Sequence, residues 1–184
     1  MRIYSIGHSN KSSDELIDML KRHGIGCLVD IRRNPGSARF KQFNRPTLER
    51  TLTRSGIRYQ WEGDALGGRR EETPDDLKHC GLDPEFRSYA SYMETQDFRE
   101  AVDQLLKLAR GCRTAFMCAE KDPSYCHRSL ISDYLTVRGY IVEHLIAGNQ
   151  SCKHELHCTA RIVGSQLIYD RAQRTLPLFA SDAP

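Results

Sequence analysis

The sequence predicts an α/β fold in which helices cover both faces of a mainly parallel sheet and a hairpin follows near the C-terminal end. Two observations support this prediction. Short apolar runs alternate with segments of helical period, and this order is typical of parallel sheets because each crossover needs a helix. The length of 184 residues suits one core and is short for two. We therefore expect one α/β domain over residues 1–170 and a tail over 171–184.

The first third of the chain alternates strand and helix signals. Ser12 with Glu15 three positions later indicates a capping box at the start of a helix, and Gly24 suits its end. The neighbouring apolar runs are short, as buried strands are. The predicted order is strand, helix, strand, helix, strand over residues 3–6, 12–24, 27–31, 46–56 and 57–61.

Residues 62–85 hold four glycines, two prolines and many charges, and they predict a long excursion loop of the kind that often forms a lid. Apolar spacing over residues 95–109 then predicts a helix, with Gly111 just past its end. The remaining predicted elements are a strand, a helix, a strand and a terminal hairpin, over residues 114–118, 130–137, 141–146, 156–163 and 166–169.

Composition indicates an ordinary globular protein, with 39% hydrophobic and 28% charged residues. No apolar run is long enough for a bilayer and the N-terminus lacks a secretory pattern, so we expect a cytoplasmic protein that does not enter a membrane. Seven cysteines then favour a free thiol or a metal ligand over a disulfide framework. The net charge of +3 permits an anionic partner without arguing for one.

Polar segments follow four of the predicted strands. In open parallel sheets, ligands bind beyond the carboxyl ends of the strands, where loops from different strands converge. The sequence therefore predicts one site at this edge. Its candidate catalytic residues are His8, Cys118, Glu120, Cys126 and His127, and its candidate substrate-binding residues are Ser9, Asp30, Arg32, Gly67, Gly68 and Arg128.

The segment from Cys118 to Arg128 is the most informative, because it runs from a strand end into the start of a helix. Amides and the helix dipole there favour an anion or a thiolate, which would lower the pKa of the Cys126 thiol, and Arg128 would offer a fork for phosphate or carboxylate. Glu120 suits a general acid or base, or a carboxylate nucleophile. Cys118 lies ten residues before Arg128, too far for the short loop of cysteine phosphatases and sulfurtransferases.

Each candidate also has a structural interpretation. Cys118 continues an apolar strand and suits a small buried side chain. Asp30 and Arg32 suit an ion pair at a strand end, and Glu120 suits a partner for a neighbouring cation. The glycines at 67 and 68 suit a turn as well as a close approach to phosphate.

A metal centre is a further interpretation of the same residues. Cys118 and Cys126 with a histidine are metal-ligand types, although the seven-residue gap between the cysteines fits no usual zinc ribbon. His8 or His154 would complete such a site. The sequence identifies neither the metal nor a cofactor.

Six motifs recur in order along the chain: IGHS, LVDIRR, the FN of RFKQFN, LGGRR, YASYM and CAEKDPSYCHRSLI. In these motifs, over roughly residues 3–170, the sequence resembles the domain-of-unknown-function 488 family. The resemblance implies a Rossmann-like α/β fold of three layers and gives no reaction. Cys152, His157 and Cys158 lie outside the family pattern and receive no role. The site positions that the resemblance implies are His8, Asp30, Arg32, Cys118, Glu120, Cys126, His127, Arg128 and His154.

The C-terminal tail holds a second pattern. Gln173, Leu176, Leu178 and Phe179 have the spacing of the peptide that binds the bacterial DNA sliding clamp. A tail with apolar anchors can dock in a groove without disturbing the fold. Alternatively, these side chains pack back on the domain.

Three functional hypotheses follow. The first is an enzyme that acts on an anionic nucleotide or nucleic-acid-derived substrate, with Arg32 and Arg128 binding charge and Glu120 or Cys126 performing the chemistry. The second is a non-enzymatic accessory module associated with DNA. The third is a metal or redox module that uses Cys118, Cys126 and a histidine.

Overall fold

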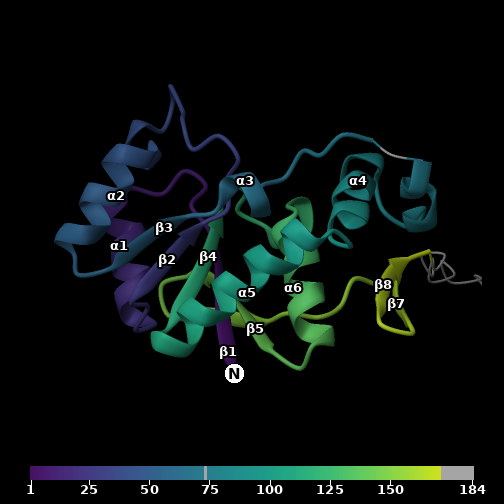
Figure 1. Cartoon of the computed structure of the whole chain (residues 1–184). Helices are drawn as coiled ribbons and strands as arrows, with labels where there is room; N and C mark the ends of the chain where they lie inside the picture. The colour runs from purple at the N-terminus through teal and green to yellow at the C-terminus, as the bar shows by residue number, and fades with distance from the viewer. Residues whose placement is uncertain (73, 171–184) are drawn as a thin grey trace, which may run out of the picture.

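A six-stranded sheet lies at the centre of the computed structural model, which describes residues 1–72 and 74–170 (Figure 1). The strand order is β3-β2-β4-β1-β5-β6, and all neighbouring pairs are parallel except β5 and β6. The prediction of a mainly parallel sheet is therefore confirmed. The antiparallel edge strand β6 was not among the strands predicted from the sequence. The strands are β1 (Arg2–Gly7), β2 (Cys27–Asp30), β3 (Arg58–Trp61), β4 (Thr114–Cys118), β5 (Ile141–Ala147) and β6 (Gln150–Lys153).

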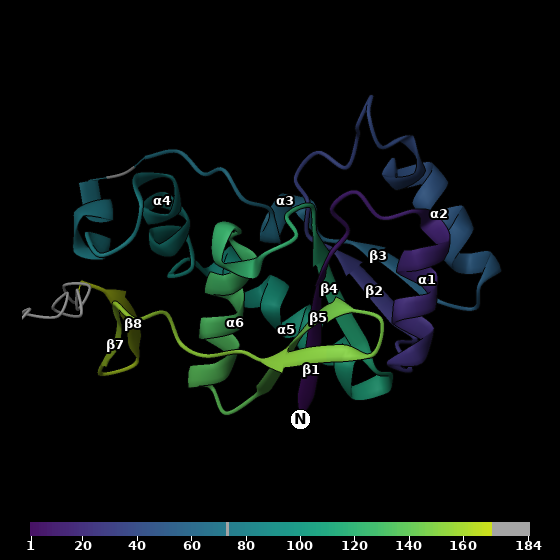
Figure 2. The ribbon, with the colours of Figure 1, turned by 180° about the vertical axis from the view of Figure 1, so that it is seen from behind.

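Helices cover both faces of the sheet and complete the three predicted layers. Successive residues of a strand point to opposite faces, so Leu28 packs in a core with α1 and α2, while Val29 packs in a core with α5 and α6. Figures 1 and 2 show these helix pairs on opposite sides of the strands. The four helices are α1 (Ser13–Arg22), α2 (Arg45–Arg54), α5 (Gln96–Gly111) and α6 (Arg128–Val137).

The capping box that the sequence predicts for the first helix is confirmed. Ser12 accepts a hydrogen bond from the backbone N–H of Glu15, and the Glu15 carboxylate accepts one from the backbone N–H of Ser12 at 2.6 Å. These two bonds satisfy amides that have no partner inside the helix. The helix start, and with it the course of the segment after β1, is fixed by local sequence.

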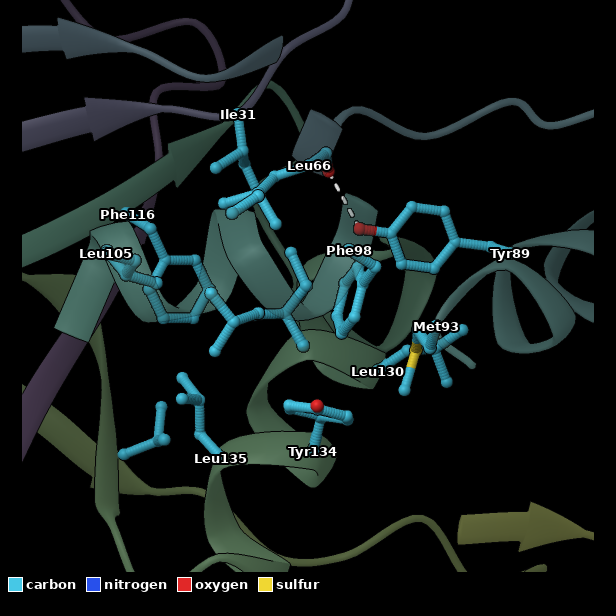
Figure 3. Packing of buried hydrophobic residues seen from close by; sticks show 14 of the residues in the cluster. Ile31, Leu66, Tyr89, Met93, Phe98, Leu105, Phe116, Leu130, Tyr134 and Leu135 are labelled. Atoms are coloured by element: carbon cyan, nitrogen blue, oxygen red, sulfur yellow. Dashed lines mark hydrogen bonds between the residues drawn. The ribbon is translucent and has the colours of Figure 1, made fainter. Parts of the chain in front are cut away.

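The excursion after β3 is more ordered than the predicted loop. It contains α3 (Gly63–Leu66), the 3₁₀ helix η2 (Pro74–His79) and the start of α4 (Pro84–Tyr92). The loop prediction misread the prolines, because a proline at the first turn of a helix is favourable. The Tyr89 hydroxyl of α4 donates to the carbonyl of Leu66 at 2.8 Å and joins the excursion to the core (Figure 3).

The predicted hairpin is present, with a shorter first strand, as β7 (Ala160–Val163) and β8 (Gln166–Tyr169). Gly164 takes the left-handed conformation, with φ of 61°, that the tight turn requires. The hairpin lies away from the sheet and beside η2 and α4 (Figure 2), and the Gly81 N–H donates to the carbonyl of Tyr169 at 2.7 Å. Among the helices of the described ranges, none has the length and apolar character needed to cross a membrane.

The register of the central strands sets the position of the site. Gly7 of β1 lies opposite Cys118 of β4, and Asp30 of β2 lies opposite Met117. The carboxyl ends of these three parallel strands therefore lie at one edge of the sheet. The segments that follow them begin side by side.

Candidate functional site

Backbone hydrogen bonds hold the segments after β1 and β4 together beyond the strands themselves. The His8 N–H donates to the carbonyl of Cys118 at 3.0 Å, and the Ser9 N–H donates to that of Ala119 at 2.8 Å. Ser9 has a φ of 50°, a left-handed conformation that is uncommon for a residue with a Cβ atom. The turn after β1 therefore lies against the turn after β4.

Asp30 and Arg32 form the buried ion pair that was one of the two sequence-based interpretations. Arg32 Nε lies 2.8 Å from Asp30 Oδ1, and Arg32 Nη2 lies 2.6 Å from Asp30 Oδ2. The Tyr59 hydroxyl donates to Oδ2 at 2.9 Å. Burial and the Asp30 charge raise the pKa of Tyr59. Bidentate pairing fixes the orientation of Arg32 at the strand end.

The hydrogen bonds of His8 determine its tautomer. Its Nε2 lies 3.1 Å from Arg32 Nη1 and must accept, because a guanidinium only donates. Its Nδ1 lies 2.9 Å from the carbonyl oxygen of Ser9 and must donate. Burial, and next the charge of Arg32, lower the pKa of His8 to about 4. His8 is therefore a neutral imidazole at pH 7, with both ring nitrogens bonded.

A cavity of about 490 Å³ opens over these segments, a volume within the usual range for small-molecule sites. We call it the strand-end pocket. Its walls come from the segments after β1, β2 and β4, and Phe40 adds an aromatic face. Its polar and charged lining residues are His8, Ser9, Asn10, Arg32, Asn34, Ser37, Arg39, Glu120 and Lys121.

The charge around the strand-end pocket is mainly positive. Arg39 and Lys121 line it with exposed side chains, and Glu120 is its carboxylate. Lys11 lies nearby, with its Nζ donating to the carbonyl of Gly7 at 2.9 Å. Burial lowers the pKa of Lys11, and Arg128 and Lys121 lower it further. A lysine whose pKa is lowered by other cations lies in a region of positive potential.

Cys118, Cys126 and His127 form a second group, which we call the thiol cluster. His127 Nδ1 lies 3.9 Å from Cys118 Sγ and 3.7 Å from Cys126 Sγ, and all three residues are buried. The Cys126 thiol, followed by His127, lowers the pKa of Cys118 well below its ordinary value, while the same hydrogen bond raises that of Cys126. Cys118 is thus the more readily ionised thiol of the pair.

The expectation of a low pKa at Cys126 is therefore wrong, for a local reason. The helix start does act on this thiol, since the charge and backbone of Arg128 favour its ionised form. These effects are smaller than the hydrogen bond to Cys118 and the desolvation of a buried sulfur. Only one of two adjacent buried thiols ionises readily.

Arg128 is almost completely buried, and its guanidinium binds the protein's own backbone. Nη1 donates to the carbonyl of Glu120 at 2.6 Å and Nη2 to that of Lys121 at 2.8 Å. A Cβ atom at Gly7 would lie 1.7 Å from the Glu120 carbonyl oxygen, so only glycine fits there. Arg128 and Gly7 together hold the turn that carries Glu120 against β1.

The sequence profile of the family described as Domain of unknown function DUF488 matches residues 12–135. The chain belongs to this family. The matched range includes Asp30, Arg32 and the whole segment from Cys118 to Arg128, whereas His8 lies before it and His154 after it. Comparison with the curated proteins and with the solved structures gives no significant match.

In this DUF488 domain the sheet edge brings most of the predicted residues together, in two groups. His8, Ser9, Arg32 and Glu120 line the strand-end pocket. Cys118, Cys126 and His127 form the thiol cluster. The hydrogen bond from the His8 N–H to the Cys118 carbonyl joins this cluster to the pocket.

His154 is not part of either group. Its Nδ1 lies 2.9 Å from His144 Nε2, and its Nε2 lies 2.8 Å from Asp133 Oδ1. These contacts use both of its ring nitrogens, just as Arg32 and Ser9 use those of His8. Neither histidine therefore has a free nitrogen with which to complete the thiol cluster.

Neither of the two predicted glycines lines the strand-end pocket: Gly67 packs against Gly63 and Arg33, and Gly68 packs against His127 of the thiol cluster. A Cβ atom at Gly67 would lie 2.2 Å from the carbonyl oxygen of Gly63, and one at Gly68 would lie 2.9 Å from His127 Nδ1. Both positions need glycine because of close approach. The motif after the third strand thus contacts the thiol cluster through Gly68.

Sequence reasoning missed Lys11, Arg39, Phe40 and Lys121 around the pocket of this DUF488 domain. The position of Lys121, just after Glu120, was the available signal. Arg39 and Phe40 lie in the RFKQFN motif, but a polar segment of that length gives no periodicity from which its position over the sheet follows. The four clamp-peptide residues Gln173, Leu176, Leu178 and Phe179 lie outside the described residues.

A larger cavity, of about 780 Å³, lies between the segment around Arg69 and helix α4. Four of its charged side chains, those of Arg33, Arg70, Lys78 and Glu94, bind partners within the protein. Lys78 Nζ contacts Glu94 Oε2 at 2.5 Å, and the Arg70 guanidinium lies over the ring of Tyr92 at 3.7 Å. We place the candidate site in the smaller pocket, because groups from three strand ends meet there.

Proposed function

We propose that the protein is an enzyme that binds an anionic, nucleotide-class substrate in the strand-end pocket and uses Glu120 to transfer a proton. The observation that carries this proposal is the convergence of Arg39 and Lys121, from the segments after two strands, around a cavity whose lining, within the described ranges, has one carboxylate. Such clusters concentrate anions from solution.

Arg39 and Lys121 supply the charge that a substrate would meet. Arg32 is already paired with Asp30, so its role is to shape the wall and to hold His8. The Phe40 ring is half-buried in the lining, and the Arg39 guanidinium lies over it at 5.1 Å from the ring centre, so the two side chains together offer an aromatic and cationic surface to a planar anion. These features favour a phosphate or carboxylate attached to a planar group.

Glu120 is the proton-transferring group that the pocket geometry favours. Its side chain is exposed in the pocket, and its backbone is held by Arg128. His8 is a weaker candidate, because both of its nitrogens are bonded and its pKa is lowered to about 4. General acid or base catalysis of this kind contributes about 10²–10⁴-fold to a rate.

Binding of nucleoside monophosphates, with inorganic phosphate as the smallest probe, tests the proposal by calorimetry. We expect Arg39→Ala and Lys121→Ala each to weaken binding about tenfold or more, since each removes a charge-assisted contact. Lys107→Ala, on the exposed side of α5, is the matched control. Absence of binding, or equal binding by all variants, would contradict the proposal.

Glu120→Gln separates binding from chemistry once a bound nucleotide is known. The neutral amide keeps the size of the side chain and removes its titratable proton. We expect binding to be kept or strengthened and turnover to fall by about 10²-fold or more. Full turnover by this variant would remove Glu120 from the mechanism.

A role beside DNA is a separate prediction. It depends on the sliding-clamp-like peptide that ends at Phe179, which lies outside the described residues, and on the mild basicity of the chain. A nucleic-acid or clamp partner would be compatible with an enzyme that acts on nucleotides. The contacts of the strand-end pocket do not depend on it.

A further inference from the structure

We propose that Cys118, Cys126 and His127 bind a zinc ion in a three-ligand site with one coordination position left open. The three ligand atoms all lie within 4.8 Å of one another. In a tetrahedral zinc site, bonds of about 2.3 Å to sulfur and about 2.0 Å to nitrogen separate a sulfur and a nitrogen ligand by about 3.5 Å. The corresponding separations here are 3.7 and 3.9 Å.

The backbone holds these ligands in place without a metal. Cys118 ends β4, and its carbonyl accepts from His8. The Cys126 N–H donates to the carbonyl of Pro123 at 3.0 Å, and His127 is the N-cap of α6. A site whose ligands are already gathered loses little conformational entropy when an ion binds.

Gly68 packs against the face of the His127 imidazole beside Nδ1. A Cβ atom at this position would lie 2.9 Å from His127 Nδ1, the nitrogen that faces both sulfurs. Gly68 is itself partly exposed. The absence of a side chain at position 68 therefore allows the imidazole to keep the orientation in which Nδ1 faces both sulfurs.

The donor set selects the class of metal. Two thiolates and an imidazole suit zinc, whereas magnesium and calcium require oxygen ligands, and no carboxylate belongs to this group in the described part of the chain. Binding releases to solvent the proton of each cysteine that is still a thiol, so that both sulfurs bind as thiolates. The two thiolates then balance the charge of the ion, so that a neutral unit is buried.

The fourth position would be taken by water or by a ligand, because His8 and His154 have no free nitrogen. A zinc ion with three protein ligands and an exchangeable fourth is the catalytic type of zinc site, and the structural type has four protein ligands. This inference goes beyond the anion-binding proposal and does not rest on it, since no residue of the thiol cluster lines the strand-end pocket.

Metal titration of the reduced, chelator-treated protein tests the inference. Cys80, Cys152 and Cys158 are exposed, so they are first replaced by serine to remove other thiols. We expect one equivalent of Co²⁺ to produce thiolate-to-cobalt charge transfer and the visible bands of tetrahedral cobalt, and one equivalent of Zn²⁺ to displace it. A folded, reduced protein that binds neither ion would overturn the proposal.

Two variants assign the site. Cys126→Ser should weaken zinc binding about 100-fold, because it removes a direct ligand. Gly68→Ala keeps all three ligands and should weaken binding about tenfold, while Gly111→Ala, where the added methyl group meets nothing within 4 Å, should have no effect. Circular dichroism and thermal unfolding report folding. Unchanged affinity in folded Cys126→Ser and Gly68→Ala proteins would place the metal elsewhere.

The outcome is independent of the anion-binding proposal. Nucleotide binding that depends on Lys121 can persist when zinc binding fails, and the reverse also holds. Each proposal therefore has its own readout.

Discussion

Two buried clusters of polar side chains include residues of helix α6 or of its N-terminal end. They differ in how many of their polar atoms have hydrogen-bond partners. At the start of the helix, the side chains of Cys126 and His127 are linked to each other and to Cys118 through long sulfur contacts, and His127 Nε2 has no hydrogen-bond partner among the described residues. In its middle, Asp133 accepts from His154 Nε2 at 2.8 Å, from the His157 N–H at 3.0 Å and from the Tyr169 hydroxyl at 3.0 Å.

The bonds of Asp133 continue into the sheet as a chain with one direction. With Asp133 as the acceptor, His154 Nε2 donates to it, and His154 Nδ1 then accepts from His144 Nε2 at 2.9 Å. His144 Nδ1 in turn accepts from the Ser5 hydroxyl at 2.6 Å. Every member is satisfied with both imidazoles neutral.

The contrast separates polar groups that hold the fold from polar groups that are available to a ligand. A fully satisfied buried network fixes one arrangement, here joining α6 to β1, β5 and the hairpin strand β8. An unsatisfied buried group costs free energy that a bound ligand or an ordered water can recover. Burial alone would not have distinguished the two regions.

The largest effect expected from this contrast is at Asp133. Asp133→Ala leaves His154, Tyr169 and an amide without an acceptor in the core, so we expect the free energy of unfolding to fall by about 3–5 kcal/mol. Urea denaturation measures it. Asp103→Ala, on the exposed face of α5, should change stability by less than about 0.5 kcal/mol. Equal losses of unfolding free energy in both variants would show that the Asp133 network does not stabilise the fold.

The second largest effect expected is a loss of stability in acid, through His144 of the Asp133 network. Burial, and next the charge of His154, lower the pKa of His144 from 6.5 to about 3, with Arg128 lowering it further and Asp122 raising it. Between these two pH values, His144 is protonated in the unfolded chain and neutral in the folded chain. Stability is fully present above pH 6.5 and should fall below it by up to about 1.4 kcal/mol per pH unit for this group.

His8, with its pKa lowered to about 4, acts in the same direction over a narrower range. Urea unfolding at several pH values between 7 and 4 measures the slope of unfolding free energy against pH. His144→Gln should reduce this slope and leave the contribution of His8. A variant with the full slope of the unmodified protein would remove His144 from the acid response.

The smallest effect is expected at the thiol cluster. Cys126→Ala removes one sulfur that makes only weak contacts, so the metal-free protein should lose about 1 kcal/mol, the value of a small apolar group. The same denaturation series measures it against Asp133→Ala. A loss as large as that of Asp133→Ala would show that the cluster holds the fold and that the contrast between the two regions is wrong.

Local sequence predicted the elements that have strong local signals. The capping box of Ser12 and Glu15, the strand over residues 114–118 and the hairpin turn at Gly164 all follow from periodicity, capping and turn chemistry between near neighbours. The strand-end rule also predicted that His8, Arg32 and Glu120 would lie at one edge. It succeeded because parallel strands present their carboxyl ends together.

Only the tertiary structure decided what each of these residues is bonded to. That Arg128 binds the backbone of Glu120, that His154 belongs to the Asp133 network, and that Arg39 lies in the pocket are contacts between segments distant in the chain. Spacing along a sequence fixes which residues share a face or an edge. The tertiary packing fixes the distances between their atoms, and those distances determine which buried groups are satisfied and which remain open to a ligand.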